Sequence, residues 1–342
     1  VEKFEDQFSD YIGSKYCIAV NNGTSALHAA LLALDIKKTD EVLVPSFSFF
    51  ATCESVSLIG AAPVFVDSDY QNFNLDLDDL ESKINSNTKA IICVHLYGQS
   101  CDMKRLKEIS DKYNLYLIED AAQAHGAEYK GRRAGSLGTI ATFSLFANKV
   151  ITSGEGGVIV TDSEELANKC RYYRNQCFPL NGPRHFIHED IGYNYRMTNV
   201  QAALAWAQLG KIDDLIDGRR RVNAEYRRHL EGVPGIGFQH EMSWAKNIFW
   251  MTAITIDPVE AGFKRNDLER HLIDQQIQTR RLFVGMNQQP VLETETQDSG
   301  EEAGFPVSDF LADNGLYLPS SSHLEQEKIE AISVAITELV SS

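Results

Sequence analysis

The stretch Ala141–Gly157, ATFSLFANKVITSGEGG, decides the fold of this chain and points to its chemistry. Its first part is rich in β-branched and aromatic residues, which predicts a buried strand over Thr139–Leu145. Its second part carries Lys149 into a glycine-rich segment that disfavours a helix. We therefore expect the amine of Lys149 on a tight connection after a strand end, and not on a solvated helix face.

A second stretch, IEDAAQAHG at Ile118–Gly126, places Asp120 at the end of another apolar strand. An amine that forms a Schiff base and a carboxylate that faces a ring nitrogen are the groups that a pyridoxal phosphate enzyme needs most. Each residue alone is more often structural, since a lone lysine is usually a surface charge. Together, and in this order, Asp120 and Lys149 predict the catalytic pair of a pyridoxal phosphate site.

Strand-like and helical runs alternate from about residue 17 to about residue 162. The expected strands are near-continuously apolar: Cys17–Val20, Glu41–Pro45, Ala62–Val66, Ala90–His95, Leu115–Glu119, Thr139–Leu145 and Gly157–Thr161. The expected helices between them are Thr24–Leu34, Phe49–Ile59 and Asp102–Tyr113. This alternation predicts an α/β fold, with a mainly parallel sheet covered by helices on both faces. Ligands in such folds lie beyond the carboxyl ends of the strands.

The second half of the chain has a different pattern. A long helical region is expected from Thr198 to about Leu230, with a break near Gly218. A strand over Phe249–Ile256 and helices over Arg265–Gln275 and Gln326–Val340 then predict a smaller α+β domain. Since 342 residues exceed one simple core, we expect a large domain over residues 1–217 and a small one over 218–342. The polar stretch Glu293–Gly304 is expected to be an exposed loop.

Bulk properties exclude several classes of protein. A net charge of −16 argues against nucleic-acid binding, which needs clustered cations. Neither a membrane-length apolar run nor a signal peptide is found, so we expect no membrane partner and a cytoplasmic location. The cysteines lack CxxC spacing and lie in apolar segments, which favours reduced, buried thiols and no metal site. The chain opens within an amphipathic helix, VEKFEDQFSDYIG, so residues ahead of Val1 are expected in a natural protein.

Several further residues could complete a cofactor site. Gly23, Thr24 and Ser25 in NNGTSALHAAL open a helix whose free amides suit a phosphate, although an ordinary helix cap would have the same sequence. Ser144 can add a hydroxyl to the same phosphate. Phe49, which follows a strand end, can stack on a flat ring or belong to the core.

The remaining candidates are polar side chains near expected strand or helix ends. Gln123 is expected near the phenolic oxygen of the ring, while His125 stays open between a structural and a site role. His95 either lines the pocket or is structural. In GYNYRMTN, Asn194 and Arg196 either cap the next helix or reach an anionic ligand.

Six of these motifs carry a family resemblance, because they agree in order and spacing over nearly the whole chain. The chain resembles the DegT/DnrJ/StrS-type nucleotide-sugar aminotransferases, which are fold-type I pyridoxal phosphate enzymes with a large α/β/α domain and a smaller C-terminal domain. NKVITSGEGG and YNYRMTN look most like the members that make GDP-perosamine. The six motifs are NNGTSALHAAL, VPSFSFFAT, VHLYGQSCDM, IEDAAQAHGA, FSLFANKVITSGEGG and GYNYRMTNVQAAL.

The resemblance implies a Schiff base at Lys149, ring pairing by Asp120, a contact from Gln123, and phosphate binding by Thr24, Ser25 and Ser144. It also implies a homodimer with shared sites, in which Asn194 reaches the phosphate of the neighbouring subunit's cofactor. The implied reaction converts a nucleotide-linked 4-keto-6-deoxy sugar, first GDP-4-keto-6-deoxymannose, to its 4-amino sugar with L-glutamate. Such a reaction serves lipopolysaccharide O-antigen biosynthesis.

The chain also departs from the family pattern. The resemblance implies further residues ahead of the opening helix, which are missing here or were removed. TRRLFVGMNQQP at Thr279–Pro290 resembles the related sugar 3-dehydratases. Those enzymes have a histidine where this chain has Lys149, so the lysine favours transamination. Arg280 and Arg281 in this segment, with Arg196, are candidates to grip the substrate diphosphate, although a solvated pair is the alternative.

Other reactions stay open at this point. They are 3-dehydration, and amination of a UDP- or dTDP-linked keto sugar at C3 or C4. A non-catalytic regulator would have lost the lysine, the aspartate or the phosphate site, and all three are present. A pyridoxal phosphate lyase or desulfurase is a third possibility. A desulfurase would need a reactive cysteine on a polar loop, whereas the cysteines here lie mostly in apolar segments.

Overall fold

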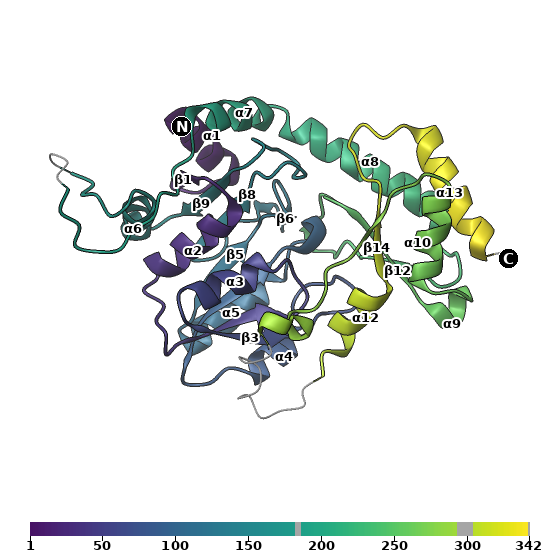
Figure 1. The fold of residues 1–342 in the computed structure, drawn as a ribbon, viewed down its shortest axis with the longest axis horizontal. Coiled ribbons are helices and arrows are strands. Elements are labelled where there is room, and N and C mark those ends of the chain that lie inside the picture. The colour runs from purple at the N-terminus through teal and green to yellow at the C-terminus, as the bar shows by residue number, and fades with distance from the viewer. Residues whose placement is uncertain (182–185, 293–303, 341–342) are drawn as a thin grey trace.

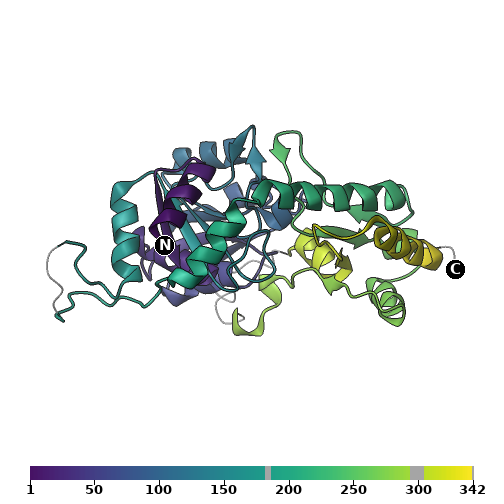
Figure 2. The same cartoon turned by 90° about the horizontal axis from the view of Figure 1, so that it is seen from above.

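The computed structural model describes residues 1–181, 186–292 and 304–340, which form two bodies joined by one long helix. The larger body holds the N-terminus and the smaller one the C-terminus (Figure 1). Helix α8, Ile212–Leu230, runs from the first body along the second, and Figure 2 shows it as the bridge between them. The expected boundary after residue 217 falls inside this continuous helix and stays a prediction.

The larger body is built on a seven-stranded sheet in the order β1-β9-β8-β5-β4-β2-β3. Six strands run in one direction and β9 runs against them, pairing antiparallel with both β1 and β8. The mainly parallel sheet is therefore confirmed. Its strands are β1 Tyr16–Val20, β2 Glu41–Pro45, β3 Ala62–Val66, β4 Thr88–Val94, β5 Tyr116–Asp120, β8 Ile140–Ser144 and β9 Gly157–Thr161.

Helices cover both faces of this sheet, because its strands present apolar side chains on both sides. One face packs against α2 Gly23–Ala33, α3 Ala51–Leu58 and α6 Glu164–Arg174. The other packs against α1 Glu2–Ile12, α4 Leu77–Ser82, α5 Met103–Tyr113 and α7 Asn199–Leu209. Phe4, Phe8 and Ile12 of α1 are all buried, as their spacing predicts. The carboxyl ends of β4, β5 and β8 meet at one edge, which positions the site described below.

The smaller body has a four-stranded antiparallel sheet in the order β10-β12-β14-β13. Its core lies between this sheet and α8, α10 and α13. A three-stranded ribbon, β11-β6-β7, connects the two bodies. The elements are β6 Glu128–Tyr129, β7 Arg132–Arg133, β10 Ile236–Phe238, β11 Ala245–Lys246, β12 Thr252–Ile256, α9 Pro258–Ala261, α10 Arg265–Asp274, β13 Arg280–Arg281, α12 Pro306–Asn314, β14 Gly315–Leu318 and α13 Gln326–Val340. Short 3₁₀ turns are η1 Leu96–Gly98, η2 Met286–Gln288 and η3 Pro290–Leu292.

Two expectations about this half were wrong. The helical region breaks at Gly210–Lys211, between α7 and α8, and not at Gly218. Gly218 lies inside α8. A Cβ at this position would stand 2.6 Å from the carbonyl oxygen of Ser322, so the glycine permits the two segments to pack closely. The strand expected from Phe249 begins only at Thr252, since Phe249 has a φ of 46°.

Two other expectations concern the loop Glu293–Gly304 and the absence of a membrane span. The loop expected over Glu293–Gly304 lies outside the described residues, apart from Gly304. Among the helices in the described ranges, none combines the length and the apolar character needed to cross a membrane.

Candidate active site

Lys149 lies in a turn that follows β8, as the sequence predicts. Its backbone N–H donates to the carbonyl of Phe146 at 3.0 Å, which closes the turn. The residue stays partly accessible, but its amine lies over the indole ring of Trp250, with Nζ 4.0 Å from the ring centroid. Loss of hydration lowers the pKa of Lys149 to about 8, against the opposing effect of the Asp120 charge. A lysine with this pKa has a substantial neutral, nucleophilic fraction near neutral pH.

Trp250 fixes the position of this amine from the smaller body. Its Nε1–H donates to the carbonyl of Asn148 at 2.8 Å, so the indole is tied to the residue next to Lys149. Its backbone N–H donates to the carbonyl of Tyr97 at 2.8 Å, and the two rings stack with an interplanar angle of 16°. Trp250 therefore links the turn that carries Lys149 to the segment that carries Tyr97.

Asp120 is the last residue of β5, and its side chain is buried near Lys149. Its Oδ2 accepts a hydrogen bond from the Thr52 hydroxyl at 2.9 Å, and its Oδ1 accepts one from the N–H of Ala122 at 3.1 Å. Burial raises the pKa of Asp120, and these two hydrogen bonds and the Lys149 charge oppose the rise. Asp120 and Lys149 are close enough for each charge to shift the pKa of the other.

The start of α2 has the features of a phosphate site. The side chain of Asn22 caps the helix by accepting from the N–H of Ser25 at 2.7 Å, which leaves the amides of Gly23 and Thr24 uncapped by this residue. Ser144, at the end of β8, lies against this turn, because a Cβ on Gly23 would stand 2.9 Å from the Cβ of Ser144. Glycine is needed here for the two segments to approach.

Phe49 and Gln123 frame the same region. The ring of Phe49 is 59% exposed and lies 6.1 Å from that of Phe283, so it is not a core residue. Gln123 is buried, and its Oε1 accepts from the N–H of Tyr97 at 2.8 Å. This bond orients the side chain and leaves its amide NH₂ as the end for a ring oxygen.

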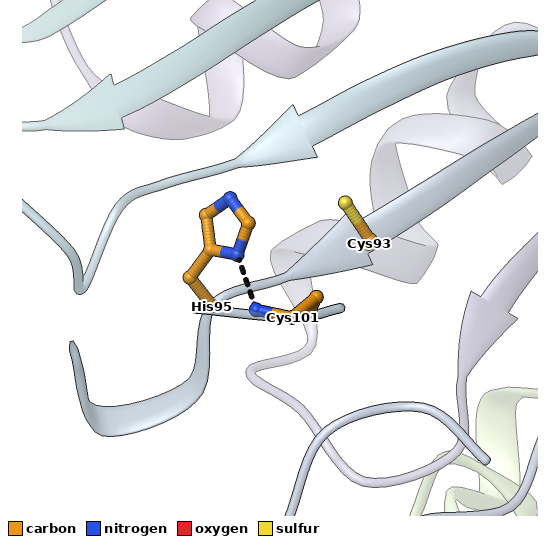
Figure 3. Close-up of side chains that lie close together, drawn as sticks. All are labelled: Cys93, His95 and Cys101. Carbon is orange, nitrogen blue, oxygen red and sulfur yellow. Dashed lines mark hydrogen bonds between the residues drawn. The ribbon is translucent and has the colours of Figure 1, made fainter. Parts of the chain in front are cut away.

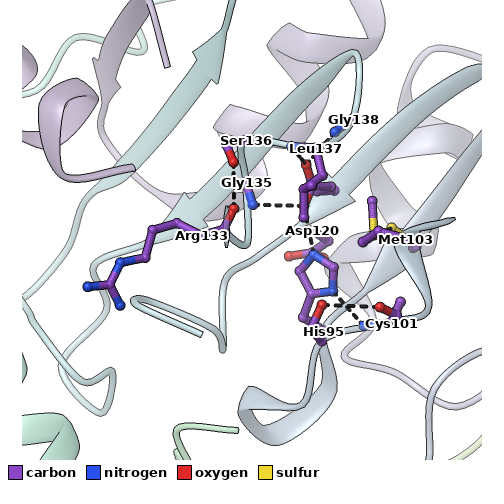
Figure 4. A network of polar contacts seen from close by, with 12 residues as sticks. His95, Cys101, Met103, Asp120, Arg133, Gly135, Ser136, Leu137 and Gly138 are labelled. Atoms are coloured by element: carbon purple, nitrogen blue, oxygen red, sulfur yellow. Dashed lines mark hydrogen bonds and ion pairs between the residues drawn. The ribbon is translucent and has the colours of Figure 1, made fainter. Parts of the chain in front are cut away.

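His95 corrects an expectation, because its side chain is not available to a substrate. It is 0% exposed, its Nε2 bonds Glu119 Oε2 at 3.0 Å, and its Nδ1 accepts from the N–H of Cys101 at 3.2 Å. Glu119 also accepts three backbone N–H groups of residues 135, 137 and 138, and Figure 4 shows this network. His95 and Glu119 point to the α5 face of the sheet, whereas Asp120, the next residue, points into the site.

His125 is also buried, and its ring lies 5.3 Å from that of Phe143. Burial and the nearby charge of Lys149 lower the pKa of His125 to about 3, so the imidazole is neutral. Its surroundings favour the structural role.

The two arginines of β13 have different surroundings. Arg281 pairs in register with Leu316, on the opposite face from Arg280, and its Nε and Nη2 bond Glu269 Oε2 at 3.0 and 2.7 Å, so its surroundings disfavour the expected substrate role. Arg280 pairs in register with Tyr317 and so shares its face of the sheet. Because the Tyr317 ring lies 6.4 Å from that of Tyr97, this is the face toward the site.

Asn194 and Arg196 lie on the exposed surface of the larger body. Neither caps α7, because Thr198 and Gln201 form a capping box there. Arg196 Nη1 donates to Asn175 Oδ1 at 2.9 Å, and a bridge to Val20 places the segment beside the end of β1.

Two residues of this site escaped sequence reasoning. Trp250 comes from a segment far along the chain, and no local pattern connects it with Lys149. Thr52 follows Phe49 by one helical turn in the motif PSFSFFAT, so the position of Phe49 at a strand end was the available signal.

The residues present fit pyridoxal phosphate: the amides of Gly23 and Thr24 at the start of α2 for the phosphate, a buried carboxylate for the ring nitrogen, and an amine with a lowered pKa. Fold and site together define a fold-type I pyridoxal phosphate enzyme. The chain matches the DegT/DnrJ/EryC1/StrS aminotransferase family over residues 1–337, and it belongs to that family. It is therefore an aminotransferase that uses pyridoxal phosphate.

Individual relatives agree with this assignment. The chain is 38% identical to the GDP-perosamine synthase of Escherichia coli O157:H7, over all of this chain and 90% of that protein. It is 36% identical to the UDP-2-acetamido-2-deoxy-3-oxo-D-glucuronate aminotransferase of Pseudomonas aeruginosa, over 98% of this chain and 90% of that one. The crystal structure of S. venezuelae DesV superposes with a TM-score of 0.92 at 33% identity, over 100% of this chain and 89% of that one.

Proposed function

We propose that this protein moves the amino group of L-glutamate to C4 of a nucleotide-linked 4-keto-6-deoxy sugar, with GDP-4-keto-6-deoxymannose as the first candidate. The observation that supports transamination is that Lys149 lies close to the buried Asp120, since the related 3-dehydratases lack the lysine. The choice of sugar rests on the 38% identity to a GDP-perosamine synthase.

Each residue has a task in this proposal. When bound, pyridoxal phosphate supplies an electron sink for the charge left when a proton leaves carbon. The amine of Lys149 removes a proton from Cα of glutamate and later delivers one to C4 of the sugar. Asp120 holds a proton on the ring nitrogen, Gln123 contacts the ring oxygen, and Phe49 stacks on the ring. The phosphate is bound by Gly23, Thr24, Ser25 and Ser144.

A second candidate is amination of a UDP- or dTDP-linked keto sugar. The supporting observation is that the Pseudomonas aeruginosa relative, named for a UDP-linked 3-oxo sugar, is nearly as similar as the GDP-perosamine synthase. Side chains that bind the substrate diphosphate cannot distinguish GDP-, UDP- and dTDP-linked sugars, because the diphosphate is common to all of them.

The test of substrate is a kcat/KM comparison of purified enzyme with glutamate and GDP-, dTDP- and UDP-linked keto sugars. We expect the GDP-linked 4-keto sugar to give a 4-amino sugar and 2-oxoglutarate in equal amounts. A far higher kcat/KM for another nucleotide would reject the choice of sugar and keep the aminotransferase. A product without its C3 hydroxyl would reject transamination.

The two adjacent arginines provide an internal control for this test. Arg280→Ala is expected to raise KM for the nucleotide sugar about tenfold or more, because a bidentate phosphate contact is lost. Arg281→Ala should leave this KM nearly unchanged, since its guanidinium bonds Glu269. Equal effects of the two variants would contradict the proposed place of the diphosphate.

We further propose that the site is shared in a homodimer, with Asn194 serving the cofactor phosphate of the neighbouring subunit. Its support is that Asn194 is exposed in a polar loop that does not cap α7. Asn194→Ala and Lys149→Ala should each be inactive alone. Mixed under subunit exchange, they should recover about a quarter of wild-type activity, because a hybrid dimer has one intact site. Full activity of Asn194→Ala, or no recovery on mixing, would contradict sharing.

A further inference from the structure

Three potential metal ligands converge on the α5 face of the central sheet, on the opposite side of β4 and β5 from Lys149. They are Cys93 in β4, His95 just after it, and Cys101 at the far end of the following loop (Figure 3). The two sulfur atoms and a ring nitrogen of His95 all lie within 4.8 Å of one another. All three residues are buried, so a ligand held there would be shielded from water.

The hydrogen bonds around His95 determine which of its nitrogens can bind a metal ion. An ion at Nδ1 would replace the hydrogen bond that this nitrogen now accepts from the N–H of Cys101. Because the N–H of Cys101 donates to Nδ1, this nitrogen carries the lone pair, and Nε2 carries the proton that Glu119 accepts. Glu119 is itself fixed by backbone N–H groups. Metal-binding histidines commonly have this arrangement, in which a carboxylate behind the ring fixes the tautomer and the ring orientation.

The two thiols interact with each other, Cys101 also interacts with His95, and each thiol has one further contact. Cys93 Sγ lies 3.9 Å from the thioether sulfur of Met103, and Cys101 Sγ lies 3.2 Å from the carbonyl oxygen of Val94. Zinc bonds of roughly 2.0–2.3 Å would draw the three ligand atoms to roughly 3.5 Å apart, which requires shifts of about 1 Å. Met103 or a water molecule can take the fourth position.

A surface pocket reaches one residue of this cluster. A surface pocket of about 190 Å³ has Cys101 in its wall, and its acidic residues are Asp69, Asp76, Asp78 and Asp102. Among the described residues that line it, Arg105 is the one basic side chain, and it is paired with Asp78. The pocket thus has an excess of negative charge, which attracts cations toward the 3% exposed Cys101.

We propose that Cys93, His95 and Cys101 form a site for a thiophilic metal ion, for which Zn²⁺ is the probe. Two thiolates and an imidazole select soft ions over Mg²⁺ or Ca²⁺, and binding releases the two thiol protons to solvent. The ion would tie the end of β4 to the loop that includes Tyr97, whose N–H orients Gln123. The site could not be predicted from the sequence, because its ligands lie at positions 93, 95 and 101 without CxxC spacing.

The test measures Zn²⁺ binding to chelator-treated holoenzyme by competition with a chromophoric chelator, and confirms the ligands by Co²⁺ substitution. We expect one Zn²⁺ per chain, a thiolate-to-cobalt charge-transfer band, and no binding of Mg²⁺. Cys101→Ala and Cys93→Ala should each weaken Zn²⁺ binding at least about 100-fold and reduce the intensity of the band. Cys170→Ala, which removes a buried thiol on the other sheet face, is the matched control and should bind normally.

The variants also separate binding from folding. Zn²⁺ should raise the unfolding temperature of the wild type and of Cys170→Ala, but not that of Cys101→Ala. Zn²⁺ bound equally by the wild type and Cys101→Ala, or a cobalt spectrum without thiolate bands, would overturn the proposal. Preferential binding of Mg²⁺ would overturn it as well, since it would indicate the pocket carboxylates alone.

Discussion

Lys149→Ala is expected to lower amino-transfer turnover by at least about 10⁴-fold, because one amine both bonds the cofactor and moves the protons. The variant should still bind pyridoxal phosphate, since the start of α2 and Asp120 do not depend on the lysine. In the wild type, borohydride should fix the cofactor on the peptide that contains Lys149. In the variant, the cofactor should separate from the chain on denaturation.

The matched control is Lys104→Ala, which removes an exposed lysine of α5 and should leave both activity and labelling unchanged. A borohydride-labelled peptide from any lysine other than Lys149 would overturn the assignment. Retention of a tenth or more of the wild-type turnover by Lys149→Ala would do so too.

The pH dependence of Lys149 provides a second measurement on the cofactor-free protein. Since only the neutral amine reacts with acetic anhydride, acetylation of Lys149 should rise with pH, with a midpoint of about 8. An ordinary lysine would have its midpoint at about 10.4. Asp120→Asn should move the midpoint of Lys149 lower, because the Asp120 charge favours the protonated amine. Peptide mass spectrometry across the pH range measures both midpoints.

Most of the larger body could be predicted from sequence, because parallel strands are short apolar runs and the helices between them have clear starts. Cys17–Val20 and Asn22–Ser25 show this, since an apolar run ends at a polar turn that opens α2. The smaller body was harder to predict. Its strands are short, and β13 has two arginines, whose place in a sheet is set by the partner strand β14.

The site residues also fall into those that the sequence could predict and those that it could not. Lys149, Asp120 and the start of α2 lie at chain positions that predict their location, because strand ends in a parallel sheet share one edge. Trp250 could not be predicted, since its contact with Lys149 depends on how the two bodies pack. His95 also ends a strand, but the position of a residue does not indicate its face. Because residues two apart in a strand share a face, His95 lies on the same face as Cys93, toward α5 and Glu119 and away from the cofactor side.

Asp120→Asn is expected to lower turnover by about 10²- to 10³-fold while the protein stays folded. The substitution keeps the shape of the side chain and removes the charge that holds the ring nitrogen protonated. Because burial raises the pKa of Asp120, the ionised carboxylate is itself unfavourable in the folded state. The neutral amide should therefore leave the unfolding temperature unchanged or slightly higher, with steady-state kinetics and a thermal melt as the two measurements.

Asp67→Asn is the matched control, because Asp67 is a buried carboxylate with a purely structural setting. It accepts from the N–H and the hydroxyl of Ser308 at 2.8 and 2.7 Å and so holds the start of α12. This variant should show the opposite pattern, with a lower unfolding temperature and near-normal turnover per folded molecule. A cofactor methylated at the ring nitrogen, which carries a permanent positive charge, should restore much of the activity of Asp120→Asn. Near-wild-type turnover of Asp120→Asn with the ordinary cofactor would show that the carboxylate does not control the ring, and rescue by the methylated cofactor would show that it does.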